Sequence, residues 1–105
     1  MTKKITVNHK EYEMPKLSID GYMDYLEIEE RVDAHTRYTK KDIADMCECI
    51  CSVYGNQFTV EELKDPKTGI DPAGLIMEFQ GIDIGVGNEL AKRMETIAKN
   101  SQTAS

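Results

Sequence analysis

The sequence predicts a small α+β domain, mainly helical, in which a short N-terminal β-hairpin precedes about four helices. Three observations predict this fold. Apolar and polar residues alternate over residues 4–14, which is the period of a strand. From residue 18 onward apolar residues recur every three or four positions, which is the period of a helix. Ser or Thr precedes three of the helical segments, and two of these carry the Ser/Thr-x-x-acidic pattern of a capping box.

The length of the chain predicts a single domain, residues 1–105. Its charge and composition exclude several classes of protein. The chain has 13 Lys+Arg against 19 Asp+Glu, a formal net charge of −6. This excess of negative charge opposes binding to nucleic acid or to an anionic membrane. No window approaches the ~18 apolar residues of a transmembrane helix, and the basic pair Lys3-Lys4 lacks the apolar stretch of a secretory signal. We expect a soluble intracellular protein that binds neither nucleic acid nor membrane.

Three cysteines stand close together at Cys47, Cys49 and Cys51. A disulfide framework needs separated partners, whereas neighbours on one helix point in different directions. The spacing also lacks the C-x-x-C pairs of common zinc sites, and the two histidines, His9 and His35, belong to other local elements. We therefore predict structural thiols in a reduced, cytosolic setting and no metal ion.

Residues 4–14 are predicted to form the hairpin. Ile5 and Val7 share one face, residues 8–10 form the turn, and Pro15 ends the ladder because it has no N–H to donate. His9 in this turn has no nucleophile or carboxylate partner in view, so we interpret it as an exposed turn residue and not as a catalytic base.

The next helix is predicted over residues 18–34, with Ser18 as its N-cap. It carries two roughly opposite apolar faces, of which only one can pack on the core. The first face consists of Ile19, Tyr22, Met23 and Leu26, and the second consists of Tyr25, Ile28 and Val32. The hairpin or another copy of the chain must cover the remaining face. We predict that the second face is a self-association surface.

The same segment is strongly acidic. Six Asp and Glu residues stand against Arg31 alone, so its formal charge is −5. Such a surface is either a solvated flank or a docking surface for a basic partner.

Residues 40–54 are predicted to form the central core helix, with Thr39 and Asp42 as its capping box and Gly55 as its stop. Its apolar stripe consists of Ile43, Met46, Cys47, Ile50, Val53 and Tyr54. A short helix over residues 60–65 follows, and Phe58 before it is interpreted mainly as a core anchor.

Residues 72–98 carry apolar residues nearly in phase at helical spacing, namely Leu75, Phe79, Ile82, Val86, Leu90, Met94 and Ile97. The period predicts one long helix, whereas Gly81, Gly85 and Gly87 favour a break at residues 81–87, and both alternatives stay open. On a continuous helix Gly81 and Gly85 would share a strip where another helix could approach closely, so they join the predicted self-association surface. The polar tail, residues 100–105, is expected to fray.

Motifs for catalysis are not evident. The glycine-rich run GIDIGVGNEL matches neither G-x-G-x-x-G nor the P-loop pattern, because Leu90 occupies the third glycine position and no Lys follows at the required spacing. The four serines have no nucleophile-elbow motif around them. We therefore expect no enzyme and no cofactor.

One segment resembles a known family. The run Tyr54-Gly-Asn-Gln-Phe-Thr-Val-Glu-Glu-Leu63, which follows an amphipathic helix and precedes Gly69-Ile-Asp71 and another helix, is similar to the tail assembly chaperones of long-tailed (siphovirus-type) phages and prophages of Gram-positive bacteria. The motif residues are Asn56, Gln57, Phe58, Thr59 and Glu62. The linker at residues 65–69 is longer than the compact Asp-Gly turn typical of the family.

The resemblance implies a non-enzymatic chaperone that acts in the host cytoplasm and is absent from the mature virion. Many copies, as a homo-oligomer, would coat the tape measure protein, keep it soluble and help recruit tail tube subunits. Many members also have a longer form made by ribosomal frameshifting. Two alternatives are an acidic binding or inhibitor protein that imitates polyanion charge, and a structural tail component.

Overall fold

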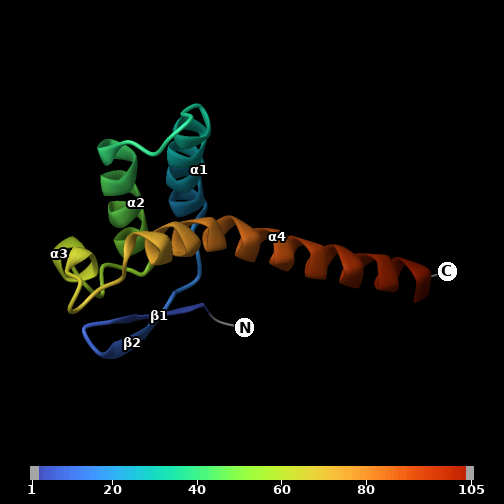
Figure 1. The fold of residues 1–105 in the computed structure, drawn as a ribbon. Coiled ribbons are helices and arrows are strands. Elements are labelled where there is room, and N and C mark those ends of the chain that lie inside the picture. The colour runs from blue at the N-terminus through green and yellow to red at the C-terminus, as the bar shows by residue number, and fades with distance from the viewer. Residues whose placement is uncertain (1–2, 104–105) are drawn as a thin grey trace.

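The computed structural model describes residues 3–103, and over this range it contains a two-stranded hairpin and four helices (Figure 1). In chain order the elements are β1 (Lys4–Val7), β2 (Lys10–Glu13), α1 (Ile19–Asp33), α2 (Lys40–Val53), α3 (Val60–Lys64) and α4 (Pro72–Thr103). This mainly helical α+β architecture confirms the predicted fold class. Helices α1 and α2 stand on one side of α4, and the hairpin lies on the other (Figure 1).

The hairpin is antiparallel, with Ile5 opposite Tyr12. Its two turn residues, Asn8 and His9, have φ of 53° and 61°, which is the left-handed backbone of a tight hairpin turn. Asn tolerates this region better than most residues, because its short polar side chain can bond locally. Ile5 and Val7 are buried, so one face of the hairpin closes the core.

Each helix begins at a side-chain cap. Ser18 Oγ accepts a hydrogen bond from the Gly21 amide at 2.9 Å, and Asp71 Oδ1 accepts one from the Gly74 amide at 2.7 Å. The N-termini of α2 and α3 carry full capping boxes, in which the cap residue and the third helical residue bond each other's backbone. These caps satisfy amides that would otherwise lack an intrahelical partner.

Helix α2 is the centre of the core, because α1, α3 and α4 all contact it. The buried apolar residues are Ile5, Val7, Tyr25, Met46, Cys47, Cys49, Ile50, Cys51, Val53, Tyr54, Phe58, Leu63, Leu75, Phe79 and Ile82. Phe58 packs between the hairpin and α2, with its ring 5.2 Å from that of Tyr12 and 5.7 Å from that of Tyr54.

Helix α4 is continuous through residues 81–87, so the three glycines do not break it. It also runs to Thr103, beyond the expected end at residue 98. Residues 100–103, which were expected to fray, are therefore helical, and residues 104–105 lie outside the described part of the chain. The helix continues far past the other elements (Figure 1). The radius of gyration is 16.2 Å, against about 13 Å for a compact domain of this size.

Candidate partner-binding surface

The apolar face that α1 turns to the core is the one expected to bind another copy. Tyr25 is buried, and its ring lies 4.6 Å from that of Phe79, while Ile28 and Val32 are half-buried against the same core. The prediction that these three residues form a self-association surface is therefore wrong. The Tyr25 ring also stacks on the ring of Tyr22, a residue of the opposite face, and aromatic pairs of this kind contribute beyond the area that they bury.

Three of the four residues of the opposite face of α1 are exposed, and the fourth, Tyr22, is half-buried against the core. Ile19 is 82% exposed, Met23 59% and Leu26 41%. Exposed acidic residues flank this apolar row, and no cation within residues 3–103 forms an ion pair with Asp20 or Glu27. We call the residues Ile19, Asp20, Met23, Asp24, Leu26 and Glu27 the acidic α1 face.

A second exposed apolar row lies on the far half of α4. Leu90, Met94 and Ile97 are each 59% exposed, although they continue the stripe that packs Leu75 and Phe79 into the core. None of the other described elements covers this row, because the helix has left the body of the protein at this point (Figure 1). We call residues 86–99 the α4 tail.

The two glycines of the predicted self-association strip have different surroundings. A Cβ at position 81 would lie 2.9 Å from Lys3 Nζ, which bonds the Glu78 carbonyl at 2.9 Å and its carboxylate at 2.8 Å. Gly81 therefore lies beside the N-terminal segment of its own chain, and its place in a self-association surface stays a prediction. Gly85 has nothing within 4 Å of such a Cβ, so it stays open to a partner.

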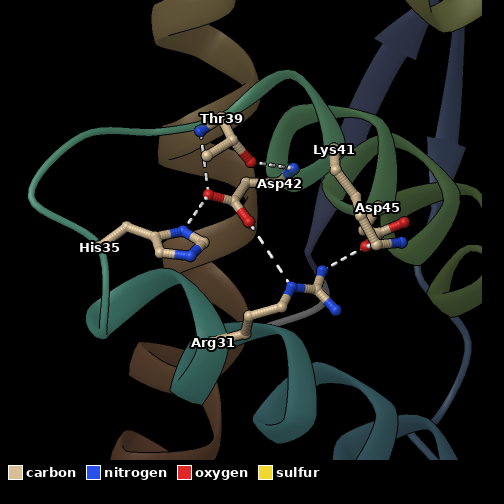
Figure 2. Close-up of polar contacts among 6 residues, drawn as sticks. All are labelled: Arg31, His35, Thr39, Lys41, Asp42 and Asp45. Atoms are coloured by element: carbon tan, nitrogen blue, oxygen red, sulfur yellow. Dashed lines mark hydrogen bonds and ion pairs between the residues drawn. The ribbon is translucent and has the colours of Figure 1, made fainter.

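A buried carboxylate joins α1 to α2 and fixes the orientation of the acidic α1 face (Figure 2). Asp42 is fully buried; it accepts a hydrogen bond from the Thr39 amide at 3.0 Å and lies 2.8 Å from His35 Nδ1. Arg31 Nε is 3.6 Å from Asp42 Oδ1, and the Arg31 guanidinium also contacts Asp45. Hydrogen bonds to the carboxylate lower the pKa of Asp42 to about 2. The bond from the Thr39 backbone amide has the largest effect, and the bonds with the His35 and Thr39 side chains add to it.

The motif residues after α2 build a turn. Asn56 has φ of 56°, and its amide bonds the Cys51 carbonyl at 2.8 Å, which closes the C-terminus of α2. The side-chain amide of Gln57 donates from Nε2 to the backbone carbonyls of Glu13 and Tyr54, at 3.0 Å and 2.7 Å. These contacts tie the hairpin to α2.

The second half of the motif starts α3. Thr59 Oγ1 accepts from the Glu62 amide at 3.1 Å, and the Glu62 carboxylate accepts from the Thr59 amide at 3.0 Å. Phe58, just before this box, is 3% exposed. In this chain the motif residues thus hold elements together, and Phe58 presents almost no surface to a partner.

The three cysteines are buried free thiols. Burial raises the pKa of Cys49 and of Cys51 to about 11, and it also raises the pKa of Cys47. These thiols are protonated at neutral pH and are therefore weak nucleophiles. Within the described residues, no three His, Cys, Asp or Glu side chains are grouped to hold a metal ion. Across the same range, no helix is both long enough and apolar enough to span a bilayer.

The structure is that of a small, mainly helical protein with exposed apolar rows on α1 and α4, of which the α1 row is flanked by acidic residues. Contiguous exposed apolar surface of this kind is typical of interaction sites. The chain belongs to the family described as phage tail chaperone protein, whose model matches residues 1–103. No curated protein and no solved structure matches the chain.

Proposed function

We propose that this chain is a non-enzymatic tail assembly chaperone that acts in the host cytoplasm on the tape measure protein of a long-tailed phage. The observation that carries the proposal is family membership over residues 1–103. Several copies would cover apolar helical segments of the tape measure protein, keep it extended and soluble, and help recruit tail tube subunits. The chaperone would leave as the tube forms, so it would be absent from the mature virion.

The client contact is assigned to the outer side of α4. Met77 is 72% exposed and Ile84 63% exposed. They are seven residues apart, which is two helical turns, so they lie on one face opposite the buried stripe of α4. A long client helix that repeats its apolar residues at the same interval can pack along this face.

The acidic residues of α1 supply the charge that keeps such a complex in solution. Asp24, Glu27 and Glu30 are exposed, whereas Glu29 is half-buried and one of its carboxylate oxygens is inaccessible. The first three thus present outward charge. A covered apolar client surrounded by carboxylates repels its neighbours and resists aggregation.

Co-expression with the tape measure protein of the same phage tests the proposal. We expect the tape measure protein to move from the insoluble to the soluble fraction, because covered apolar helices no longer aggregate. The complex should survive about 0.5 M salt, where the Debye length is only ~4 Å, since the contact is largely apolar. A tape measure protein that stays in the pellet at every dose would contradict the proposal.

A second candidate function, binding to a basic protein, follows from Asp20 and Glu27 of α1. No cation among the described residues forms an ion pair with either of them. An acidic protein that occupies the nucleic-acid site of a basic protein would use such a surface. This candidate predicts no solubilising effect and a pull-down of a basic protein that is lost as salt rises. The same two assays, run at low and high salt, therefore separate the candidates.

A further inference from the structure

Two of the exposed apolar rows among the described residues, one on α1 and one on the α4 tail, have the same spacing. Ile19, Met23 and Leu26 follow the pattern i, i+4, i+7, and Leu90, Met94 and Ile97 follow it as well. We infer that the α4 tail of one copy docks on the acidic α1 face of the next copy as a short parallel helix pair. The copies would then join head to tail. This inference concerns copies of this chain alone and needs no client.

The shared spacing fits coiled-coil packing. Steps of four and three residues are the d-to-a and a-to-d intervals of a heptad, so each row offers three consecutive core positions. In parallel register Leu90 packs on Ile19, Met94 on Met23 and Ile97 on Leu26. All six side chains are at least 41% exposed, so the pairing covers them without opening the core.

The flanking charges favour the parallel orientation. Arg93 directly precedes the core position of Met94, and Glu27 directly follows that of Leu26, so a parallel pair places them opposite each other as a g–e′ ion pair. An antiparallel pair would instead place Arg93 toward Tyr22, whose hydroxyl donates to Asp83 at 2.8 Å, and toward Glu29, which is half-buried.

Net charge points the same way. The α4 tail carries three cationic and two acidic residues, whereas α1 has a formal charge of −5. The Arg93–Glu89 pair within the tail is an exposed i, i+4 contact at 3.0 Å, and such pairs contribute only ~0.3–0.5 kcal/mol. Arg93 can therefore exchange Glu89 for the carboxylate of another copy. Two α1 faces, by contrast, would repel each other.

The tail cannot reach the α1 of its own chain while α4 is continuous. Tyr22 bonds Asp83 at 2.8 Å, which marks where α1 crosses α4. At 1.5 Å per residue, positions 90–97 lie about 10–20 Å farther along the helix axis, directed away from the body (Figure 1). A tail that meets a different patch on the next copy makes a heterologous contact, which can repeat and build a chain of copies.

Charge reversal in trans tests the pairing. Arg93→Glu and Glu27→Arg should each abolish concentration-dependent self-association, measured by sedimentation velocity, because like charges then face each other at the junction. An equal mixture should restore it, because each copy then finds a neighbour of opposite charge. The acidic tail of the first variant meets the basic face of the second, and the unchanged tail of the second meets the unchanged face of the first. Lys92→Glu is the matched control: it makes the same charge change on the side of the tail away from the row, and it should weaken assembly far less than Arg93→Glu does.

Apolar variants test the head-to-tail geometry. Met23→Asp removes the docking face but keeps the tail, and Met94→Asp does the reverse. Each alone should be monomeric, and their mixture should form a one-to-one complex that does not grow, because only one intact junction can form. If Met23→Asp still assembles like the unchanged chain, the tails pair with each other and the inference is overturned. A chain that is monomeric at all concentrations, or a charge mixture that stays monomeric, also overturns it.

These outcomes are independent of the client. Self-association is measured on the purified chain, so it can fail while the tape measure protein is still solubilised. Equally, the copies can assemble while the client stays insoluble, which would contradict the proposed function alone. Circular dichroism of each variant checks that α4 remains helical.

Discussion

At the scale of single residues, the buried carboxylate of Asp42 combines three roles. It caps α2, holds His35 in the loop after α1, and lies beside Arg31 of α1. The capping box with Thr39 is visible in the sequence because its two residues are three positions apart. The contacts of Arg31 and His35 with Asp42 cannot be predicted from the sequence, because they depend on the path of residues 34–39 between the two helices.

Asp42→Asn should lower the free energy of unfolding by about 1–3 kcal/mol, because a neutral amide leaves buried hydrogen-bonding groups poorly matched. Asp33→Asn, a change of the same kind outside this buried network, should alter it by less than about 0.5 kcal/mol. Urea unfolding of both variants measures the difference. Equal effects would show that Asp42 does not join α1 to α2.

The same residue makes stability depend on pH. The pKa of Asp42 is about 2 in the folded chain against an ordinary value of 3.8, so the unfolded chain takes up the proton first. This contribution to stability is complete above about pH 4 and is lost as the pH falls toward 2. Unfolding free energies measured across this range should fall less steeply for Asp42→Asn than for the unchanged chain.

At the scale of elements, two helices show what the sequence can and cannot determine. The apolar periods of α1 and α4 indicate helices correctly, because they are local. Which face of α1 is buried was not predictable, since both faces carry three or more apolar residues and the choice depends on the Tyr25–Phe79 contact between distant segments. The continuity of α4 was also undetermined, because each glycine opposes a helix by only ~1 kcal/mol.

The glycines of α4 predict a contrast between two matched substitutions. Gly85→Ala should stabilise the chain by up to about 1 kcal/mol, because Ala favours the helix and a Cβ at this position meets nothing within 4 Å. Gly81→Ala should give a smaller gain or a loss, because its Cβ must displace the Lys3 ammonium from the Glu78 carbonyl. Thermal unfolding of both variants compares them, and equal shifts would show that Lys3 contributes nothing at this site.

At the scale of the whole molecule, the protein consists of a packed body and a projecting helix that carries an uncovered apolar row. Its principal extents are 56 × 34 × 22 Å. The sequence shows one unbroken stripe from Leu75 to Ile97 and cannot show where the body ends, because that point depends on how far α1 and α2 extend along α4. The first half of this stripe is therefore buried in the core, and the second half is exposed on the projecting part of α4.

This division predicts that client binding and self-association separate by mutation. Met77→Glu combined with Ile84→Glu should abolish solubilisation of the tape measure protein and leave self-association intact, because both side chains lie away from the α4 tail and are already exposed. Met94→Asp should abolish self-association, while single copies still bind the client. More protein would then be needed to solubilise the client, because neighbouring copies no longer reinforce each other's binding. Solubility titrations and sedimentation of both variants provide the comparison. If both variants lose both properties, the two surfaces are one, and the client occupies the same apolar row that we assign to the next copy.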